Sequence, residues 1–336
     1  MTSSNPAAEL VLLLTGYRVS QAIYVAATLG IADLIKDGKS SASDLAIATN
    51  SHPTALYRVL RALAAAGVFH EDDEKRFSLT PLGECLRSDA ERSIAAYAVF
   101  VGRPHLWQAW GALSHSVRTG ENAYRHVHGI GLWDYLDEHP EEAAIFDRAM
   151  TVGSRGIVES IVSTYDFSAF NRVVDVGGGQ GVMIAAVLAA HPDIHGILFD
   201  RPDVVAQAQS ILEAAGVAGR CAVVGGSFFE TIPEGGDVYM LKYILHNWDD
   251  ATSLAILSAC RRVFHAEEKL LIMEQIVEGP NKGLETKISD LHMLVFPGGQ
   301  ERTAGEFAAL LAKAGFRMER IVAVNPRLSI IEAMPI

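Results

Sequence analysis

Short apolar runs alternate with helical patterns along the second half of the chain, from about residue 170 onward. The runs have the length of buried strands, and the segments between them have helical periodicity. The predicted strands cover residues 172–176, 196–199, 221–224, 237–241 and 270–276, and the predicted helices include 182–190, 203–215 and 252–264. This alternation predicts a doubly wound α/β fold, with a parallel sheet and helices on both faces.

The chain ends with a different pattern. A predicted helix over 304–314 is followed by two apolar runs, 318–324 and 329–332, with Asn-Pro-Arg between them. A turn of this kind joins neighbouring strands in a hairpin. We therefore expect one antiparallel edge strand, which is unusual for a dinucleotide-binding domain.

Residues up to about 165 are mostly helical by periodicity. Within them, the sequence predicts helices at 43–49 and 54–66, a glycine cap at Gly67, and apolar segments 68–69 and 77–79 around a turn over 71–75. This is the outline of a winged helix, with Arg58 and Arg61 on its second helix. The turn is acidic and would face phosphates, so we expect the motif to serve packing or dimerisation rather than DNA binding.

A long apolar stretch over residues 10–35 carries few charges. Such a surface must be covered, and we expect a partner subunit to cover it.

Length and charge narrow the class of protein. The 336 residues suit about two domains. A formal net charge of -12 argues against nucleic-acid or anionic membrane binding, which needs a basic surface. Three scattered cysteines, Cys85, Cys221 and Cys260, suit neither a disulfide framework nor a zinc site. Residues 1–9 lack a basic leader, and no apolar run approaches the ~18 residues of a membrane span, so we expect a cytoplasmic protein.

A glycine-rich turn joins the first predicted strand of the second half to its helix. Residues 175–181 are Asp-Val-Gly-Gly-Gly-Gln-Gly. Such a turn lets a ligand approach the backbone and aims helix N-terminal amides at it. Its spacing differs from the Gly-x-Gly-x-x-Gly of dinucleotide-binding turns. Asp175 would repel a pyrophosphate but can hold a cationic amino group, so the turn favours S-adenosylmethionine over NAD.

Two later strand ends carry residues that suit the same ligand. Asp200 follows the second strand, where an acidic residue accepts hydrogen bonds from ribose hydroxyls. Phe228 and Phe229 follow the third strand, where a ring can lie against an adenine face.

The fourth strand is followed by His246, at the edge where open α/β sheets bind ligands. Glu274 lies inside the apolar fifth strand, where a carboxylate is unfavourable unless it is paired. Glu301 follows a glycine turn. Acids that orient a histidine and stabilise its charged form make it a general base. His126 and His128 have no further ligand at a convincing spacing, so we expect no metal site.

These motifs together resemble the O-methyltransferase family that includes plant caffeic acid methyltransferases and bacterial antibiotic-pathway methyltransferases. The resemblance covers nearly the whole chain. It rests on the N-terminal helices with the winged helix, on residues 175–181, on Leu-His-Asn-Trp at 245–248, and on Gly-Gly-Gln-Glu-Arg-Thr at 298–303. It implies a mostly helical winged-helix dimerisation domain (1–100) and a Rossmann-like, doubly wound class I methyltransferase domain (101–336). Residues 101–165 would be a helical linker lining the substrate pocket.

The resemblance also implies roles for individual residues. S-adenosylmethionine, leaving as S-adenosylhomocysteine, would bind without a metal to Asp175, Gly177, Gly179, Asp200, Arg201, Ser227, Phe228 and Lys242. Gly177 and Gly179 would lie by its methionine part and Phe228 by its adenine. His246 would deprotonate the acceptor, flanked by Glu274 and Glu301. The acceptor pocket would be lined by Phe146, Met150, His292 and Met293.

Two positions depart from the family pattern. Ser227 stands where an Asp usually contacts the adenine amine, which predicts weaker cofactor binding. Asn247 stands where an Asp often follows the base, and we expect that neighbour to be structural.

The resulting hypothesis is a homodimeric O-methyltransferase of a phenolic hydroxyl on a small aromatic metabolite. An N-methyltransferase on the same fold is an alternative, although a histidine with two acids suits oxygen better. A winged-helix regulator that senses a ligand is a second alternative, which the acidic balance disfavours. Trp107 and Phe296 join the pocket residues in indicating an apolar, aromatic-sized acceptor.

Overall fold

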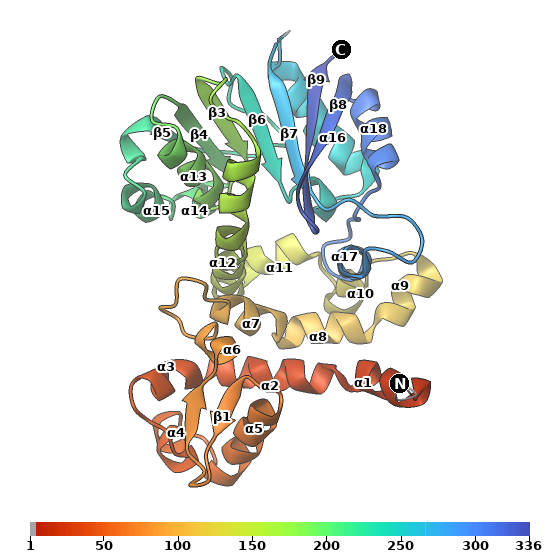
Figure 1. Ribbon diagram of the computed structural model, residues 1–336. Helices are drawn as coiled ribbons and strands as arrows, with labels where there is room; N and C mark the ends of the chain where they lie inside the picture. Colours follow the sequence, from red (N-terminus) through yellow and green to blue (C-terminus); the bar gives the residue numbers. More distant parts are fainter. Residues whose placement is uncertain (1–4, 266) are drawn as a thin grey trace. The chain divides into compact units, whose positions relative to one another are not determined.

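The computed structural model describes residues 5–265 and 267–336 (Figure 1). Residues 1–4, part of the segment inspected for a leader, lie outside the described residues. The chain forms two compact units. One comprises residues 1–107 with 144–153, and the other comprises residues 108–143 with 154–336.

The first unit begins with three helices, α1 (Pro6–Thr15), α2 (Tyr17–Thr28) and α3 (Ile31–Lys36). The single apolar stretch expected over 10–35 is therefore interrupted. Gly30 caps α3 in the left-handed region (φ 63°), which favours glycine. No residue of α1, which is fully described, is buried, and Leu13 is 80% exposed.

The predicted helix–turn–helix and hairpin are present in this unit. They are α4 (Ala42–Ala48), α5 (Pro53–Ala65) and the antiparallel strands β1 (Phe69–Glu71) and β2 (Phe77–Leu79). Leu45, Leu60 and the two ring side chains Phe69 and Phe77 are buried in one cluster that holds these elements together.

The N-terminal helices correct one expectation from the sequence. Residues 6–28 form a 23-residue helical stretch that is long and apolar enough, by length and composition alone, to cross a membrane. The interruption by charged and small residues hid this stretch from a search for an unbroken apolar run. A core helix of a soluble protein and a signal sequence pass the same test of length and composition, so one such stretch is weak evidence for a membrane span.

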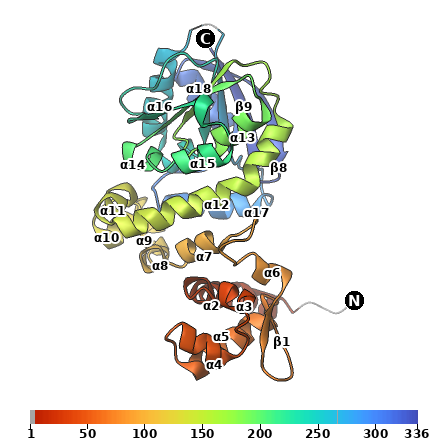
Figure 2. The same cartoon turned by 90° about the vertical axis from the view of Figure 1, so that its left-hand side faces the viewer.

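Helices connect the hairpin to the sheet. They are α6 (Pro81–Glu84), α7 (Ala95–Val101), α8 (Pro104–Gly111), α9 (Leu113–Thr119), α10 (Ala123–His128), α11 (Leu132–Glu138) and α12 (Pro140–Thr164). Figure 2 shows α12 as one long helix. The predicted helical character of this part of the chain is confirmed.

The second unit contains a seven-stranded sheet with the order β5-β4-β3-β6-β7-β9-β8 (Figure 1). Its strands are β3 (Arg172–Val176), β4 (His195–Asp200), β5 (Cys221–Gly225), β6 (Val238–Lys242), β7 (Lys269–Glu274), β8 (Phe316–Asn325) and β9 (Leu328–Pro335). The first five are parallel, whereas β9 runs antiparallel to both β7 and β8. The predicted doubly wound fold and C-terminal hairpin are confirmed. One strand runs antiparallel to the others, as expected, but it is β9, which lies next to the edge strand β8 rather than at the edge itself.

Helices and short helical turns lie between the strands. They are α13 (Val182–Ala190), α14 (Pro202–Val205), α15 (Gln209–Ala214), the 3₁₀ turns η1 (Ala218–Arg220) and η2 (Leu245–Asn247), α16 (Asp250–Val263), α17 (Leu284–Val295) and α18 (Ala304–Lys313). The helix predicted over 203–215 is thus two shorter helices. The sequence analysis did not predict α17.

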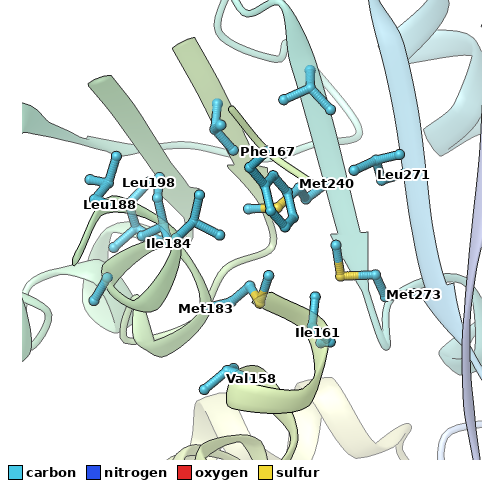
Figure 3. Close-up of a cluster of buried hydrophobic side chains, with 14 of the residues drawn as sticks. Val158, Ile161, Phe167, Met183, Ile184, Leu188, Leu198, Met240, Leu271 and Met273 are labelled. Carbon is cyan, nitrogen blue, oxygen red and sulfur yellow. The ribbon is translucent and has the colours of Figure 1, made fainter. Parts of the chain in front are cut away.

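Each face of the sheet has its own core, because side chains along a strand alternate between the faces. Leu198, Met240 and Leu271 lie on one face with α13 and the end of α12, as Figure 3 shows. Val174 and Leu241 lie on the other face with α16 and α18.

The carboxyl ends of the five parallel strands lie at one edge of this sheet. Asp175, Asp200, Lys242 and Glu274 stand at or next to the ends of β3, β4, β6 and β7. Strands β4 and β5 lie on one side of β3, and β6 and β7 lie on the other. The order of the strands therefore reverses next to β3, which makes this end of the sheet the topological switch point where open α/β sheets bind ligands.

Candidate active site

The glycine-rich turn after β3 is held against the end of β4. Gly177, Gly179 and Gly181 all have positive φ, which glycine adopts without strain. The Gly179 amide donates to Asp200 Oδ2 at 2.7 Å, so Asp200 lies directly against the turn as predicted. A Cβ placed on Gly179 would meet no heavy atom within 4 Å, so this backbone faces open space.

Asp175 lies buried beneath the turn. It is 1% exposed, and neither carboxylate oxygen has a hydrogen-bond partner among the described residues. A Cβ on Gly178 would come within 2.6 Å of Oδ2, so only glycine lets the turn close over the carboxylate. Burial raises the pKa of Asp175 to about 7, although the charge of Lys242 opposes the shift.

These features fit the cofactor expected from the sequence. The buried, unpartnered carboxylate offers a negative charge for an ammonium or sulfonium group, and the open backbone at Gly179 lets a ligand approach. Burial raises the pKa of Asp200 too, but two backbone amides donate to its carboxylate and favour the charged form.

Aromatic rings follow β5 next to the turn. Phe228 lies near Gly177, and its ring centroid is 4.8 Å from that of Phe229. Phe229 in turn lies 5.1 Å from Trp248. Ser227 Oγ accepts a backbone hydrogen bond from Phe229 at 3.3 Å.

Arg201 differs from the other predicted cofactor residues. Its guanidinium donates to Asp137 at 2.6 Å and to Asp203 at 2.9 Å, and the side chain is 43% exposed. Its charge is thus already paired with two carboxylates.

Lys242 at the end of β6 is half-buried. Its Nζ donates to Ser154 Oγ at 2.9 Å. Burial lowers the pKa of Lys242, while the charges of Asp175 and Glu274 oppose that shift. Tyr243 comes next with φ of 56°, which is strained backbone for a bulky residue. The Asn247 side chain donates to the Tyr243 carbonyl at 3.0 Å and stabilises this turn.

His246 lies between two buried carboxylates. Its Nδ1 is 3.1 Å from Glu301 Oε1 and 3.6 Å from Glu274 Oε2. Glu274 Oε1 accepts the backbone amides of Leu245 and His246 at 2.9 and 3.3 Å, which fixes the loop onto β7. The three predicted catalytic side chains are therefore brought together by β6, β7 and the loop before α18.

The electrostatics of this cluster favour a charged imidazole. Burial lowers the pKa of His246, but the charges of Glu274 and Glu301 outweigh that effect, so its pKa is raised overall. Burial, with Glu301 close by, raises the pKa of Glu274 to about 7, although His246 opposes the shift. The neutral imidazole of His246 therefore takes up a proton more readily than an isolated histidine does.

Polar side chains around Glu301 position it. Ser289 donates to Glu301 Oε1 at 2.7 Å, and Gln275 donates to the same oxygen at 3.4 Å and to Ser289 at 3.1 Å. Thr286 donates to Gln275 Oε1 at 3.1 Å. None of these residues was predicted from the sequence, because Ser289 and Thr286 lie on α17, a helix that the periodicity of the chain did not indicate.

Arg302 fixes the carbonyl groups of the His246 loop. This guanidinium is 1% exposed and donates to the carbonyls of Leu245 and Trp248, both at 3.0 Å. It also donates to Ser253 Oγ at 3.2 Å. Arg302 belongs to the Gly-Gly-Gln-Glu-Arg-Thr segment at 298–303, but no role was predicted for it. Its position directly after Glu301 was the only indication in the sequence.

The four predicted acceptor residues divide between the units. His292 and Met293 lie on α17 in the second unit, and Trp110 donates to His292 Nδ1 at 3.2 Å. Phe146 and Met150 belong to the first unit, where the Phe146 ring lies 5.6 Å from Phe100. Their place in the acceptor pocket remains a prediction.

One group of three side chains has the spacing of a metal site. Ligand atoms of His246, Glu274 and Glu301 lie within 4.8 Å of one another. Nδ1 of the histidine lies 3.1 Å from Glu301 Oε1, so the cluster is also held together by a hydrogen bond.

Comparisons with known proteins match both halves of the chain. Residues 110–317 match the model of an O-methyltransferase domain, and residues 11–89 match that of an O-methyltransferase dimerisation domain.

Three relatives cover nearly the whole chain. Phenazine O-methyltransferase PhzM of Lysobacter antibioticus is 42% identical over 342 residues, and the match covers 100% of this chain and 100% of the relative. A crystal structure of LaPhzM superposes with a TM-score of 0.96 and covers 99% of this chain and 100% of that structure. An 8-amino-8-demethylriboflavin N,N-dimethyltransferase of Streptomyces davaonensis is 37% identical over 92% of this chain and 89% of its own length. The O-methyltransferase NcsB1 from neocarzinostatin biosynthesis, solved with S-adenosylmethionine and 2-hydroxy-5-methyl naphthoic acid, is 34% identical with a TM-score of 0.82, covering 94% and 96%.

Gly299→Ala tests the packing behind His246. A Cβ there would lie 2.0 Å from the His246 carbonyl oxygen and 2.4 Å from the Asn247 carbonyl carbon, both backbone atoms, so the loop must move. We expect turnover to fall about tenfold or more, because small misplacements of catalytic groups have effects of up to ~10²-fold. Gly305→Ala on α18 is the matched control, because its nearest neighbour would be 4.0 Å away. Equal activities of the two variants would contradict this account.

Proposed function

Because the chain belongs to the O-methyltransferase family that pairs this catalytic domain with a dimerisation domain, we propose that it methylates a phenolic hydroxyl of a small aromatic metabolite, with His246 as general base. The protein is an S-adenosylmethionine-dependent methyltransferase. The observation that carries the proposal is the His246 Nδ1 contact with Glu301 Oε1 at 3.1 Å and with Glu274 Oε2 at 3.6 Å.

The carboxylates decide which nitrogen of His246 acts as the base. They accept hydrogen bonds and have no proton to donate when ionised, so they favour the tautomer with the proton on Nδ1. This leaves the lone pair on Nε2, which has no hydrogen-bond partner among the described residues. Nε2 then takes the hydroxyl proton, and Glu274 and Glu301 stabilise the imidazolium that results.

For this reaction the protein has to supply a base, because the cofactor already supplies the electrophile. Bound S-adenosylmethionine supplies a methyl group already activated by the sulfonium charge. A phenol has a pKa of about 10 and a histidine one of about 6.5, so little phenolate is present at neutral pH without help. A general base contributes about 10² to 10⁴-fold, and alignment of the reacting atoms can contribute roughly 7 to 11 kcal/mol. The rigid support of His246 by Arg302 and Glu274 serves both effects.

Nitrogen is the alternative acceptor. One relative, at 37% identity, is named an N,N-dimethyltransferase. An aromatic amine can react through its lone pair without prior deprotonation, so such a reaction has less use for a base. The assembled cluster of one histidine and two acids supports oxygen. Mass spectrometry of products from a hydroxyaniline, which offers both atoms, separates the two.

We further propose that the protein is a cytoplasmic homodimer and that α1 and α2 form the subunit interface. The proposal is supported by the dimerisation-domain match over 11–89 and by the exposed leucines of α1. An apolar surface of this kind is stable in water only when a partner covers it. The net charge of -12 supports neither a nucleic acid nor an anionic membrane as that partner.

His246→Ala tests the base. We expect turnover to fall at least tenfold, because no neighbouring group replaces Nε2, while S-adenosylhomocysteine still binds in calorimetry. His265→Ala, an 83% exposed histidine outside the site, is the control and should retain activity. Near-normal turnover of the His246 variant would remove it from this role.

Glu301→Gln tests the origin of the raised His246 pKa. The base must be unprotonated, so activity falls as pH drops through that pKa, which lies above the usual value of about 6.5. Removing one negative charge lowers the pKa, so the acid limb of the kcat/KM profile should move to lower pH. An unmoved limb, or one moved to higher pH, would contradict the electrostatic assignment.

Leu13→Glu tests the subunit interface. A charge at this exposed apolar position of α1 should convert the dimer into a monomer in light scattering, because burying an unpaired carboxylate is strongly unfavourable. Ile47→Glu is the control, since Ile47 is equally exposed, at 80%, but lies on α4. A Leu13 variant that stays dimeric would place the interface elsewhere.

A further inference from the structure

His292 is held by an aromatic neighbour on each side. It lies on α17, and the Trp110 indole N–H donates to its Nδ1 at 3.2 Å. The two rings are nearly parallel, at 19°, with centroids 6.0 Å apart. Phe296 lies against the same imidazole, with centroids 5.1 Å apart. These contacts fix the orientation of the ring.

The Trp110 hydrogen bond also fixes the tautomer of His292. An indole nitrogen can only donate, so Nδ1 must be the acceptor and carries no proton. The single ring proton is then on Nε2. Burial, with the charge of His246 nearby, lowers the pKa of His292 to about 4, so the ring stays neutral at physiological pH. Among the described residues, Nε2 has no acceptor.

His246 has the opposite arrangement. Its Nδ1 faces two carboxylates, which leaves a lone pair on Nε2. The loop that follows α17 connects the two histidines: the Gln300 amide donates to the His246 carbonyl at 2.9 Å, and the Gly298 amide donates to the carbonyl of Met293, the neighbour of His292, at 2.8 Å. The site thus offers one free nitrogen that accepts a proton and, on the adjoining helix, one free N–H that donates.

We propose that His292 is a specificity-determining residue whose Nε2–H binds a carbonyl or carboxylate oxygen adjacent to the hydroxyl that is methylated. The substrate class is therefore an aromatic hydroxy-carbonyl compound rather than a simple phenol. The inference rests on the proposed function, because it assumes that His246 Nε2 faces the reacting hydroxyl.

The pairing has a chemical consequence for such substrates. A hydroxyl next to a carbonyl group donates its proton to that oxygen in an internal hydrogen bond, which opposes deprotonation. A donor that binds the carbonyl oxygen replaces this internal bond and leaves the hydroxyl proton available to the base. A charged histidine would be unsuitable, because Trp110 could not then donate to it.

The test compares two probes of the same shape. 1-Acetyl-2-naphthol carries a carbonyl beside its hydroxyl, whereas 1-isopropyl-2-naphthol replaces that carbonyl with an apolar group. Binding of each to the full chain saturated with S-adenosylhomocysteine is measured by calorimetry. We expect wild type to prefer the acetyl compound by about tenfold, the upper range for one neutral hydrogen bond.

Two variants make the result specific. His292→Phe keeps a ring but no donor, so the preference should disappear while affinity for the isopropyl probe is retained. His292→Gln places an amide N–H near the position of Nε2 and should restore part of the preference. Equal binding of the probes by wild type, no binding of the acetyl probe, or an unchanged preference in His292→Phe overturns the proposal.

Methyl transfer to the bound acetyl probe is followed separately by mass spectrometry. Selective binding with no O-methylated product would reject the proposed reaction and leave the binding role of His292 intact. Transfer to both probes at equal rates, with equal binding, would support the reaction and reject the specificity role.

Discussion

Two buried carboxylates around one imidazole are the constraint on which the site depends. Glu274 and Glu301 have fully buried side chains, and both approach Nδ1 of His246. Two negative charges this close in a water-poor site strongly favour an added proton, and the imidazole is the group that can take it and release it near neutral pH. The surrounding hydrogen bonds stabilise an arrangement that would otherwise be unfavourable.

The fold supplies that support from three separate directions. Glu274 comes from β7 and holds the loop through two backbone amides, whereas Arg302 holds the carbonyls on either side of His246. Gly299 has no side chain, so its backbone can pack directly against the backbone of His246 and Asn247. The parallel sheet brings these segments together, because its strand ends share one edge. The glycine-rich turn and Asp200 lie at the same end of the sheet.

The sequence predicted the elements whose patterns are local. The strand-helix alternation, the glycine turn and the C-terminal hairpin follow from periodicity and turn residues. Glu274 was identifiable because a carboxylate inside an apolar strand needs a partner. Ser289 and Trp110 could not be identified from the sequence, because their roles depend on contacts with residues distant in the chain. Ser289 donates a hydrogen bond to Glu301, and Trp110 donates one to His292. The helix α17, which carries Ser289 and His292, has polar residues on several sides that obscure its period. Residues 203–215 contain no proline or glycine that would mark the break between α14 and α15 in the sequence.

The central claim is that the proton of neutral His246 is on Nδ1, held there by the two glutamates. Nitrogen-15 NMR of histidine-labelled protein observes this directly, with His246→Gln used to assign the signal among the 12 histidines. The account predicts a protonated Nδ1 and a free Nε2 at high pH, and a pKa above about 6.5 on titration. A proton on Nε2 in the neutral ring, or a pKa at or below the ordinary value, would contradict it.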